Sequence, residues 1–191
     1  MARVPCVDPE ALPEDKRELL DTLSDADEEA RNHDLKGGTL NVYRSLGNNV
    51  ALLEAFRSYG SAVWHESGLT PHERETVILA TSYHANSPYE WHQHVRVALD
   101  EGMSREEIRA VSSGDHEALE PELAAMADYV EAFVASEVDD ETHDSLADHF
   151  DEDVIVGIVT LAGLYLGLAR ALDAFDVETE VEFVGWDLEN L

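Results

Sequence analysis

Three polar residues in the middle of the chain have side chains that could transfer a proton. Glu90 and His94 stand at i and i+4, so on a helix they would lie one above the other on the same face. Glu75 shares a face of the preceding helix with the apolar residues Ile78 and Leu79. If that face is buried, the Glu75 carboxyl could act as an acid near neutral pH. We predict that Glu75, Glu90 and His94 are catalytic and face one pocket.

Neighbouring residues could bind a substrate. Arg74 or Arg96 could pair with a substrate carboxylate, although either could instead balance nearby acids. The remaining predicted substrate-binding residues flank the turn between the two helices and could line the pocket: Tyr83, His84, Ser87 and Tyr89. A purely structural interpretation stays open, in which Glu75 is a buried ion-paired carboxylate that holds the helices in register.

A metal site is an alternative interpretation of the same region. The available ligands would be His65, His84, Glu90 and His94. The chain has no HExxH run, and a Glu-xxx-His pair on one helix supplies only two ligands. We therefore predict no metal and no cofactor.

Two helices between residues 69 and 103 must position the three candidate residues. Thr70 stands at an N-cap position with Glu73 three residues later, which is the capping-box spacing. The stretch Asn86–Pro88 ends the first helix, and Ser87 could cap the second. Gly102 follows the last turn of the second helix, where a left-handed residue is usual.

The rest of the chain also reads as helical. Predicted helices cover 13–30, a short segment from 42, 48–64, 104–112, 121–138, 140–150 and the apolar run 154–169, with a loop at 32–40. No paired strands appear before residue 176. We predict an all-α bundle of about seven or eight helices: a lead-in at 1–12, one domain at 13–175, and a C-terminal tail at 176–191. The alternating tail could be an edge strand or an arm on a partner subunit.

The apolar run 154–169 is shorter than the roughly 20 residues that a membrane-spanning helix needs. It is better explained as a helix buried in the core or in a contact between subunits. Gly157, Gly163 and Gly167 would let other helices approach it closely.

The composition restricts the possible partners. The 191 residues include 42 acidic and 12 basic ones, giving a formal charge of −30. A surface this acidic repels nucleic acid and anionic membranes, so we expect neither as a partner. Hydrophobic residues make up 44% of the chain, which favours a globular protein adapted to high salt over a disordered one. Cys6 is the only cysteine and no signal peptide opens the chain, so we expect a halophilic, cytoplasmic protein.

Several short strings resemble one family. They are ERE at 73–75, YEWHQH at 89–94, and the segment from Ala98 through Gly102, Met103 and Ser104 to Glu107 and Ile108. Together they resemble the carboxymuconolactone decarboxylase family, which also contains the AhpD-like proteins. The resemblance covers about residues 40–172. It implies an all-helical, cofactor-free protomer that assembles into dimers, trimers or hexamers.

The resemblance also separates two kinds of chemistry. In the redox branch of the family, two cysteines separated by two residues precede the histidine. If His94 matches that histidine, the cysteine positions fall on Ser87 and Glu90, and the glutamate of the preceding helix falls on Glu75. Neither serine nor carboxylate can replace a redox thiol, so we do not expect thiol peroxidase activity.

The decarboxylase-like branch keeps glutamate and histidine. It implies loss of CO2 from a small carboxylated or lactone-type molecule, with His94 donating a proton and Glu90 orienting it or holding its charge. The chief alternative is a non-catalytic oligomeric binding or scaffold protein of the same fold. A thiol-independent hydroperoxide activity or a metal-dependent activity is a further alternative.

Overall fold

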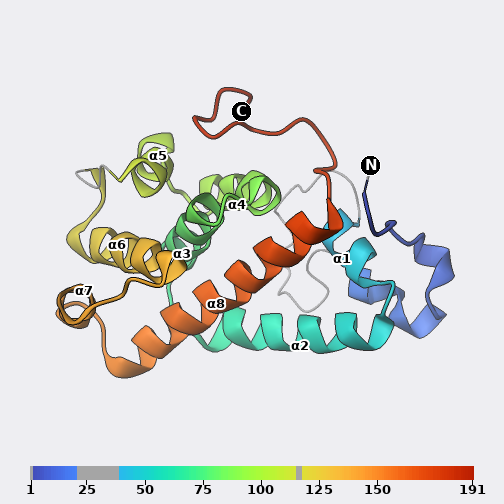
Figure 1. Ribbon diagram of the computed structural model, residues 1–191, viewed down its shortest axis with the longest axis horizontal. Coiled ribbons are helices and arrows are strands. Elements are labelled where there is room, and N and C mark those ends of the chain that lie inside the picture. Colours follow the sequence, from blue (N-terminus) through green and yellow to red (C-terminus); the bar gives the residue numbers. More distant parts are fainter. Residues whose placement is uncertain (1, 21–38, 115–117) are drawn as a thin grey trace.

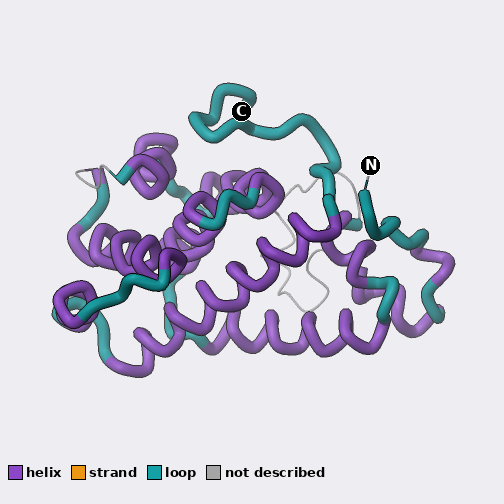
Figure 2. Tube along the Cα trace, viewed as in Figure 1, coloured by secondary structure: helices purple, strands orange, loops and turns teal. Residues whose placement is uncertain are grey.

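The computed structural model describes residues 2–20, 39–114 and 118–191. This part of the chain forms eight α-helices and two short 3-10 helices and contains no strand, which confirms the predicted all-α class (Figure 2). The α-helices are α1 (Asn41–Leu46), α2 (Val50–Glu66), α3 (Pro71–His84), α4 (Pro88–Asp100), α5 (Arg105–Ser113), α6 (Pro121–Ala135), α7 (Asp140–Ala147) and α8 (Glu152–Phe175).

The other helices pack around α3. It contacts α4, α5, α6 and α8, and every residue from Arg74 to Ser82 is buried. The sequence predicts one apolar face for this helix, whereas the structure buries it on all sides. Its hydroxyl groups tolerate burial because they donate to carbonyls one turn earlier: Thr81 to Val77 and Ser82 to Ile78, both at 2.7 Å.

The predicted helix starts are present. The Thr70 hydroxyl accepts a hydrogen bond from the Glu73 N–H at 3.3 Å, and the Glu73 carboxylate accepts one from the Thr70 N–H at 2.6 Å. Ser104 and Glu107 form a second capping box at the start of α5. Ser87 occupies the N-cap position of α4, but its side chain makes no capping hydrogen bond. The turn between α3 and α4 therefore depends on Pro88 and backbone bonds for its geometry.

The helix α8 crosses the molecule diagonally, with α2 on one side and α3 and α4 on the other (Figure 1). It is longer than the predicted apolar run because it continues past Arg170 through the buried Leu172 to Phe175. Of the three glycines expected to admit a close neighbour, Gly157 does so most tightly: a Cβ there would overlap the backbone of Ser67. A Cβ at Gly167 would meet nothing within 4 Å.

By length and composition, α8 is long and apolar enough to cross a membrane. An 18-residue window within it has a mean hydropathy of 1.9, and 33% of that window is buried. In this structure α8 packs against five other helices of the same chain: α2, α3, α4, α6 and α7.

Replacing Gly157 tests the contact between α8 and the end of α2. We expect Gly157→Ala to lower the free energy of unfolding by about 1–3 kcal/mol, because the clash is between two backbones and neither can rotate away. Gly167→Ala, on the same helix, should instead raise it by about 0.5–1 kcal/mol, because alanine is the better helix former. Urea denaturation of both variants measures the difference. Equal effects would show that α8 does not approach Ser67 closely.

The N-terminal part differs from the predicted helix at 13–30. Glu14–Leu20 forms a 3-10 helix, and Pro9–Ala11 forms another within the predicted lead-in. Leu12 and Leu20 are buried against Leu53 of α2. The remainder of the predicted helix, and residues 32–38 of the predicted loop, lie outside the described residues.

Residues 176–191, which we call the C-terminal segment, form neither a strand nor a helix. The segment runs along α4 of its own chain (Figures 1 and 2). Its Glu180 carboxylate accepts three hydrogen bonds: from the Asn41 N–H at 2.6 Å, the Tyr89 hydroxyl at 2.7 Å and the Gln93 side chain at 2.6 Å. One acidic side chain thus joins the segment to α1 and α4.

The second half of the C-terminal segment covers an aromatic face of α4. The Trp91 indole donates to the Gly185 carbonyl at 3.0 Å, and the ring of Trp186 lies 5.6 Å from that of Trp91 and 5.5 Å from that of Tyr83. Val184 is fully buried. The alternation along the tail therefore reflects one face packed on α4.

Candidate active site

A carboxylate and an imidazole meet where α3 and α4 pack together. Oε2 of Glu75 lies 2.8 Å from Nδ1 of His94. Glu75 is fully buried, whereas the His94 side chain is 13% exposed. The two helices thus bring these residues together, and Glu75 contacts His94 where the sequence suggested Glu90.

Arg74 and Trp64 close one side of this pair. The Arg74 guanidinium lies over the Trp64 ring at 3.8 Å, with its Nε 3.6 Å from Glu75 and another nitrogen 3.6 Å from Glu101. The Trp64 ring is also 6.3 Å from that of His94. Because the guanidinium is stacked and flanked by two acids, its charge is directed at the protein rather than at a ligand.

Tyr165 of α8 completes the surroundings of His94. Its ring stands nearly perpendicular to the imidazole, with the centroids 5.0 Å apart. Burial, followed by the nearby charge of Glu75, raises the pKa of Tyr165, and Glu90 contributes in the same direction. The phenol therefore stays neutral, and it lies within electrostatic reach of both glutamates.

Glu90 is buried without a hydrogen-bond partner. It is 2% exposed, and within the described part of the chain neither of its carboxyl oxygens has a partner in hydrogen-bonding geometry. Burial raises the pKa of Glu90 to about 8, and the nearby Ser87 hydroxyl and the charge of Arg170 oppose this shift only partly. Glu90 is thus a neutral carboxylic acid at pH 7, able to donate a hydrogen bond or a proton.

The other predicted substrate-binding residues do not join Glu75 and His94. Four of them contact other parts of the protein. Tyr83 packs on Trp91 and Trp186, and His84 lies 3.8 Å from Glu131. Tyr89 donates a hydrogen bond to Glu180, and Arg96 lies 2.5 Å from Nε2 of His92. Tyr89 and Arg96 are on the side of α4 that holds the C-terminal segment. Ser87, which is buried, remains beside Glu90.

The suggested metal ligands are also separated. Across residues 2–20, 39–114 and 118–191, no group of three or more His, Cys, Asp or Glu side chains is arranged to hold a metal ion.

Sequence reasoning missed Tyr165 and Arg170. Both belong to α8, far along the chain from α3 and α4. One signal was available: Tyr165 is the only aromatic residue in the run 154–169, and Arg170 is the only basic residue of α8. A phenol inside this apolar run and a cation directly after it call for a reason, and the site supplies one.

A family model matches the part of the chain that contains α3 and α4. Residues 51–132 match the model of the Carboxymuconolactone decarboxylase family. The match covers less than half of the chain. The matched residues include Glu75, Glu90 and His94, while Tyr165 and Arg170 lie beyond them. No curated protein matches the chain.

Solved structures show the same fold. The AhpD-core, uncharacterized peroxidase-related protein of Ralstonia eutropha JMP134 is 21% identical, with a TM-score of 0.79 over 97% of this chain and 96% of that one. A peroxidase-related protein of Silicibacter sp. TM1040 is 20% identical, with a TM-score of 0.76 over 95% and 92%. The debrominase Bmp8, in a complex with 2,3,4-tribromopyrrole, is 18% identical, with a TM-score of 0.69 over 75% and 78%. These likenesses show an AhpD-like fold.

The raised pKa of Glu90 predicts a pH-dependent stability. The folded state keeps this proton up to about pH 8, whereas an unperturbed glutamate releases it near 4.5, so stability falls as the pH rises between these values. Glu90→Gln removes the titration. We expect the variant to exceed the wild type in free energy of unfolding by about 1–3 kcal/mol near pH 9 and to differ little near pH 5.

Urea denaturation at the two pH values measures this difference. Glu66→Gln, an exposed change at the end of α2, is the matched control and should show no such trend. A Glu90→Gln effect of the same size at both pH values would contradict a buried neutral acid.

Proposed function

We propose that this protein is a carboxymuconolactone decarboxylase-like enzyme that acts on a small carboxylated or lactone-type molecule by proton transfer. The observation that carries the proposal is the 2.8 Å contact between buried Glu75 and His94. A carboxylate only accepts hydrogen bonds, so it favours the imidazole tautomer with hydrogen on Nδ1. Nε2 is then left with its lone pair, as a general base must be.

The side chains around His94 suit a carbanion-like reaction. When a C–C bond to a carboxylate breaks, CO2 leaves and the electron pair moves toward the lactone carbonyl oxygen. Neutral Glu90 could donate a hydrogen bond to that oxygen as negative charge develops. Nε2 of His94, which first takes up a proton from solvent, could then deliver that proton to carbon. Glu75 would stabilise the imidazolium between these steps.

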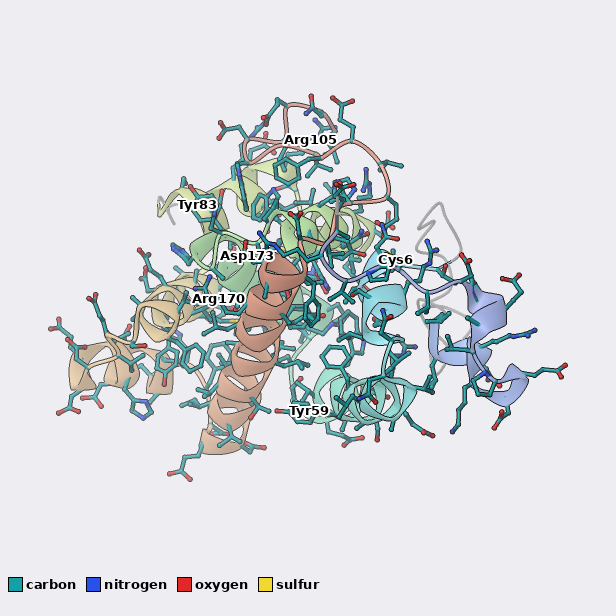
Figure 3. The ribbon with its side chains drawn as sticks, turned by 45° about the vertical axis from the view of Figure 1, so that its right-hand side comes forward. Cys6, Tyr59, Tyr83, Arg105, Arg170 and Asp173 are labelled. Carbon is teal, nitrogen blue, oxygen red and sulfur yellow. The ribbon has the colours of Figure 1, made fainter. Side chains whose placement is uncertain are left out.

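The proposal includes self-association. Two helices present large apolar side chains to solvent: Leu52 (64% exposed) and Tyr59 (48%) on α2, and Val156 (65%) on α8. Only Leu53 and Val63 of α2 are buried. Figure 3 labels Tyr59 on α2. An exposed apolar face of this kind supports a homo-oligomer, with a mass in solution that is a multiple of 21.2 kDa.

A direct assay tests the reaction. Purified protein is incubated with a panel of small lactone carboxylates and dicarboxylic acids, and CO2 release is followed at about 0.1 M and about 1 M salt, because an acidic protein depends on screening. Release of CO2 from a panel member by the wild type, and its loss on substitution of His94, supports the proposal. Binding of panel members without turnover would favour a non-catalytic binding protein.

A further inference from the structure

The two cations that the sequence suggested for a substrate carboxylate are both held by the protein. Arg74 is stacked on Trp64 and flanked by Glu75 and Glu101. Arg96 faces His92 on the side of α4 that carries the C-terminal segment. An anionic substrate of a protein with a formal charge of −30 needs a positive group at the site. Neither of these arginines supplies it.

Arg170 is placed to do so. It is the only basic residue of α8 and directly follows the apolar run 154–169. One guanidinium nitrogen donates to the Ala85 carbonyl at 2.9 Å, which fixes the group at the end of α3, three residues before the start of α4. Figure 3 shows Arg170 on α8, which packs against both of these helices. A guanidinium has five N–H donors, so a bond to one carbonyl leaves donors for a ligand.

Glu90 is within electrostatic reach of this guanidinium and has no hydrogen-bond partner among the described residues. It is 2% exposed, neither of its oxygens is hydrogen-bonded within the described ranges, and its electrostatic neighbours are Ser87 and Arg170. A buried carboxyl with no partner costs free energy unless a ligand satisfies it. Tyr165, which is within electrostatic reach of Glu90, connects this position to His94.

We propose that Arg170 is a specificity-determining residue that binds a carboxylate of the substrate, next to the Glu90 side chain. The inference rests on the proposed function, because it assigns the anion-binding part of the same site. The planar guanidinium matches a carboxylate in two parallel hydrogen bonds. The single O–H of Glu90 then remains for the lactone carbonyl oxygen next to it. The carboxylate bound there is one that stays on the molecule, since an ion pair to the departing group would favour the ground state over the transition state.

Binding of two matched probes tests the assignment. The probes are a butyrolactone that carries one ring carboxylate and its uncharged methyl ester, titrated by calorimetry into the wild type, Arg170→Gln and Arg170→Lys. Arg170→Gln should weaken carboxylate binding on the order of 10- to 100-fold and change ester binding less than about 2-fold. Arg170→Lys should restore part of the loss. Arg105→Gln, an equal charge change on exposed α5, should leave both affinities unchanged.

The outcomes separate this proposal from the one it rests on. Unchanged carboxylate affinity in Arg170→Gln, or an equal loss for the ester, overturns the role of Arg170 while wild-type turnover still stands. Binding of neither probe by folded wild type overturns both proposals. Melting curves of each variant show whether a loss of binding reflects a loss of fold.

Discussion

His94→Asn should lower turnover by about 100- to 10,000-fold and leave the stability of the protein nearly unchanged. In the wild type, Nδ1 of His94 lies 2.8 Å from Oε2 of Glu75. The amide nitrogen of asparagine occupies nearly the place of Nδ1, so it can still donate a hydrogen bond to Oε2. The variant has no group at the place of Nε2, so the general base is lost. Rates of CO2 release and urea denaturation measure the two effects separately.

Two comparisons make this result specific. His94→Ala should lose both turnover and about 1–3 kcal/mol of stability, because it leaves the fully buried Glu75 without its partner. His149→Ala removes an exposed histidine after α7 and should change neither. If His94→Asn keeps its turnover, or if it unfolds as readily as His94→Ala, the pair is structural and His94 is not the base.

Glu180→Ala should lower the free energy of unfolding by about 2–4 kcal/mol and release the C-terminal segment. Its carboxylate satisfies three donors at once, on Asn41, Tyr89 and Gln93. Removing the acceptor leaves all three donors unpaired near the core, and each unpaired buried group costs stability. Urea denaturation gives the loss, and limited proteolysis reports whether residues after 176 become accessible.

Glu182→Ala provides the matched control for this measurement. Glu182 is exposed two residues along the same segment, so its replacement makes the same chemical change without removing a buried acceptor. Stability within about 0.5 kcal/mol of the wild type is expected for it. Equal behaviour of the two variants would mean that the segment is held by its apolar contacts alone.

Local signals predicted most of the helices. The Thr70–Glu73 and Ser104–Glu107 capping boxes appear at the predicted starts, because such caps are satisfied within four residues. The end of α8 was missed, since Arg170 interrupts the apolar run although the helix continues to Phe175. The segment after 176 was ambiguous, because alternation shows that one face is buried but not against which helix.

In the candidate site, too, the contacts between neighbouring helices were predictable and those made by a distant helix were not. Glu75 and His94 belong to neighbouring helices joined by a short turn, so their meeting follows from local geometry. The i,i+4 spacing suggested Glu90 as the partner of His94, and the structure gives that place to Glu75, because spacing along one helix cannot reveal a closer group on another. Tyr165 and Arg170 reach the site only through the packing of α8, which no local pattern encodes.

Trp91 is covered by Val184, Gly185 and Trp186, which are synthesised after all the helices. Because a ribosome delivers α4 long before it delivers residues 184–186, the nascent bundle carries an uncovered indole while the later helices are still being made. During that interval the aromatic face of α4 is open to chaperones and to neighbouring nascent chains. The change in Trp91 fluorescence as these residues cover it should therefore report a late step of folding.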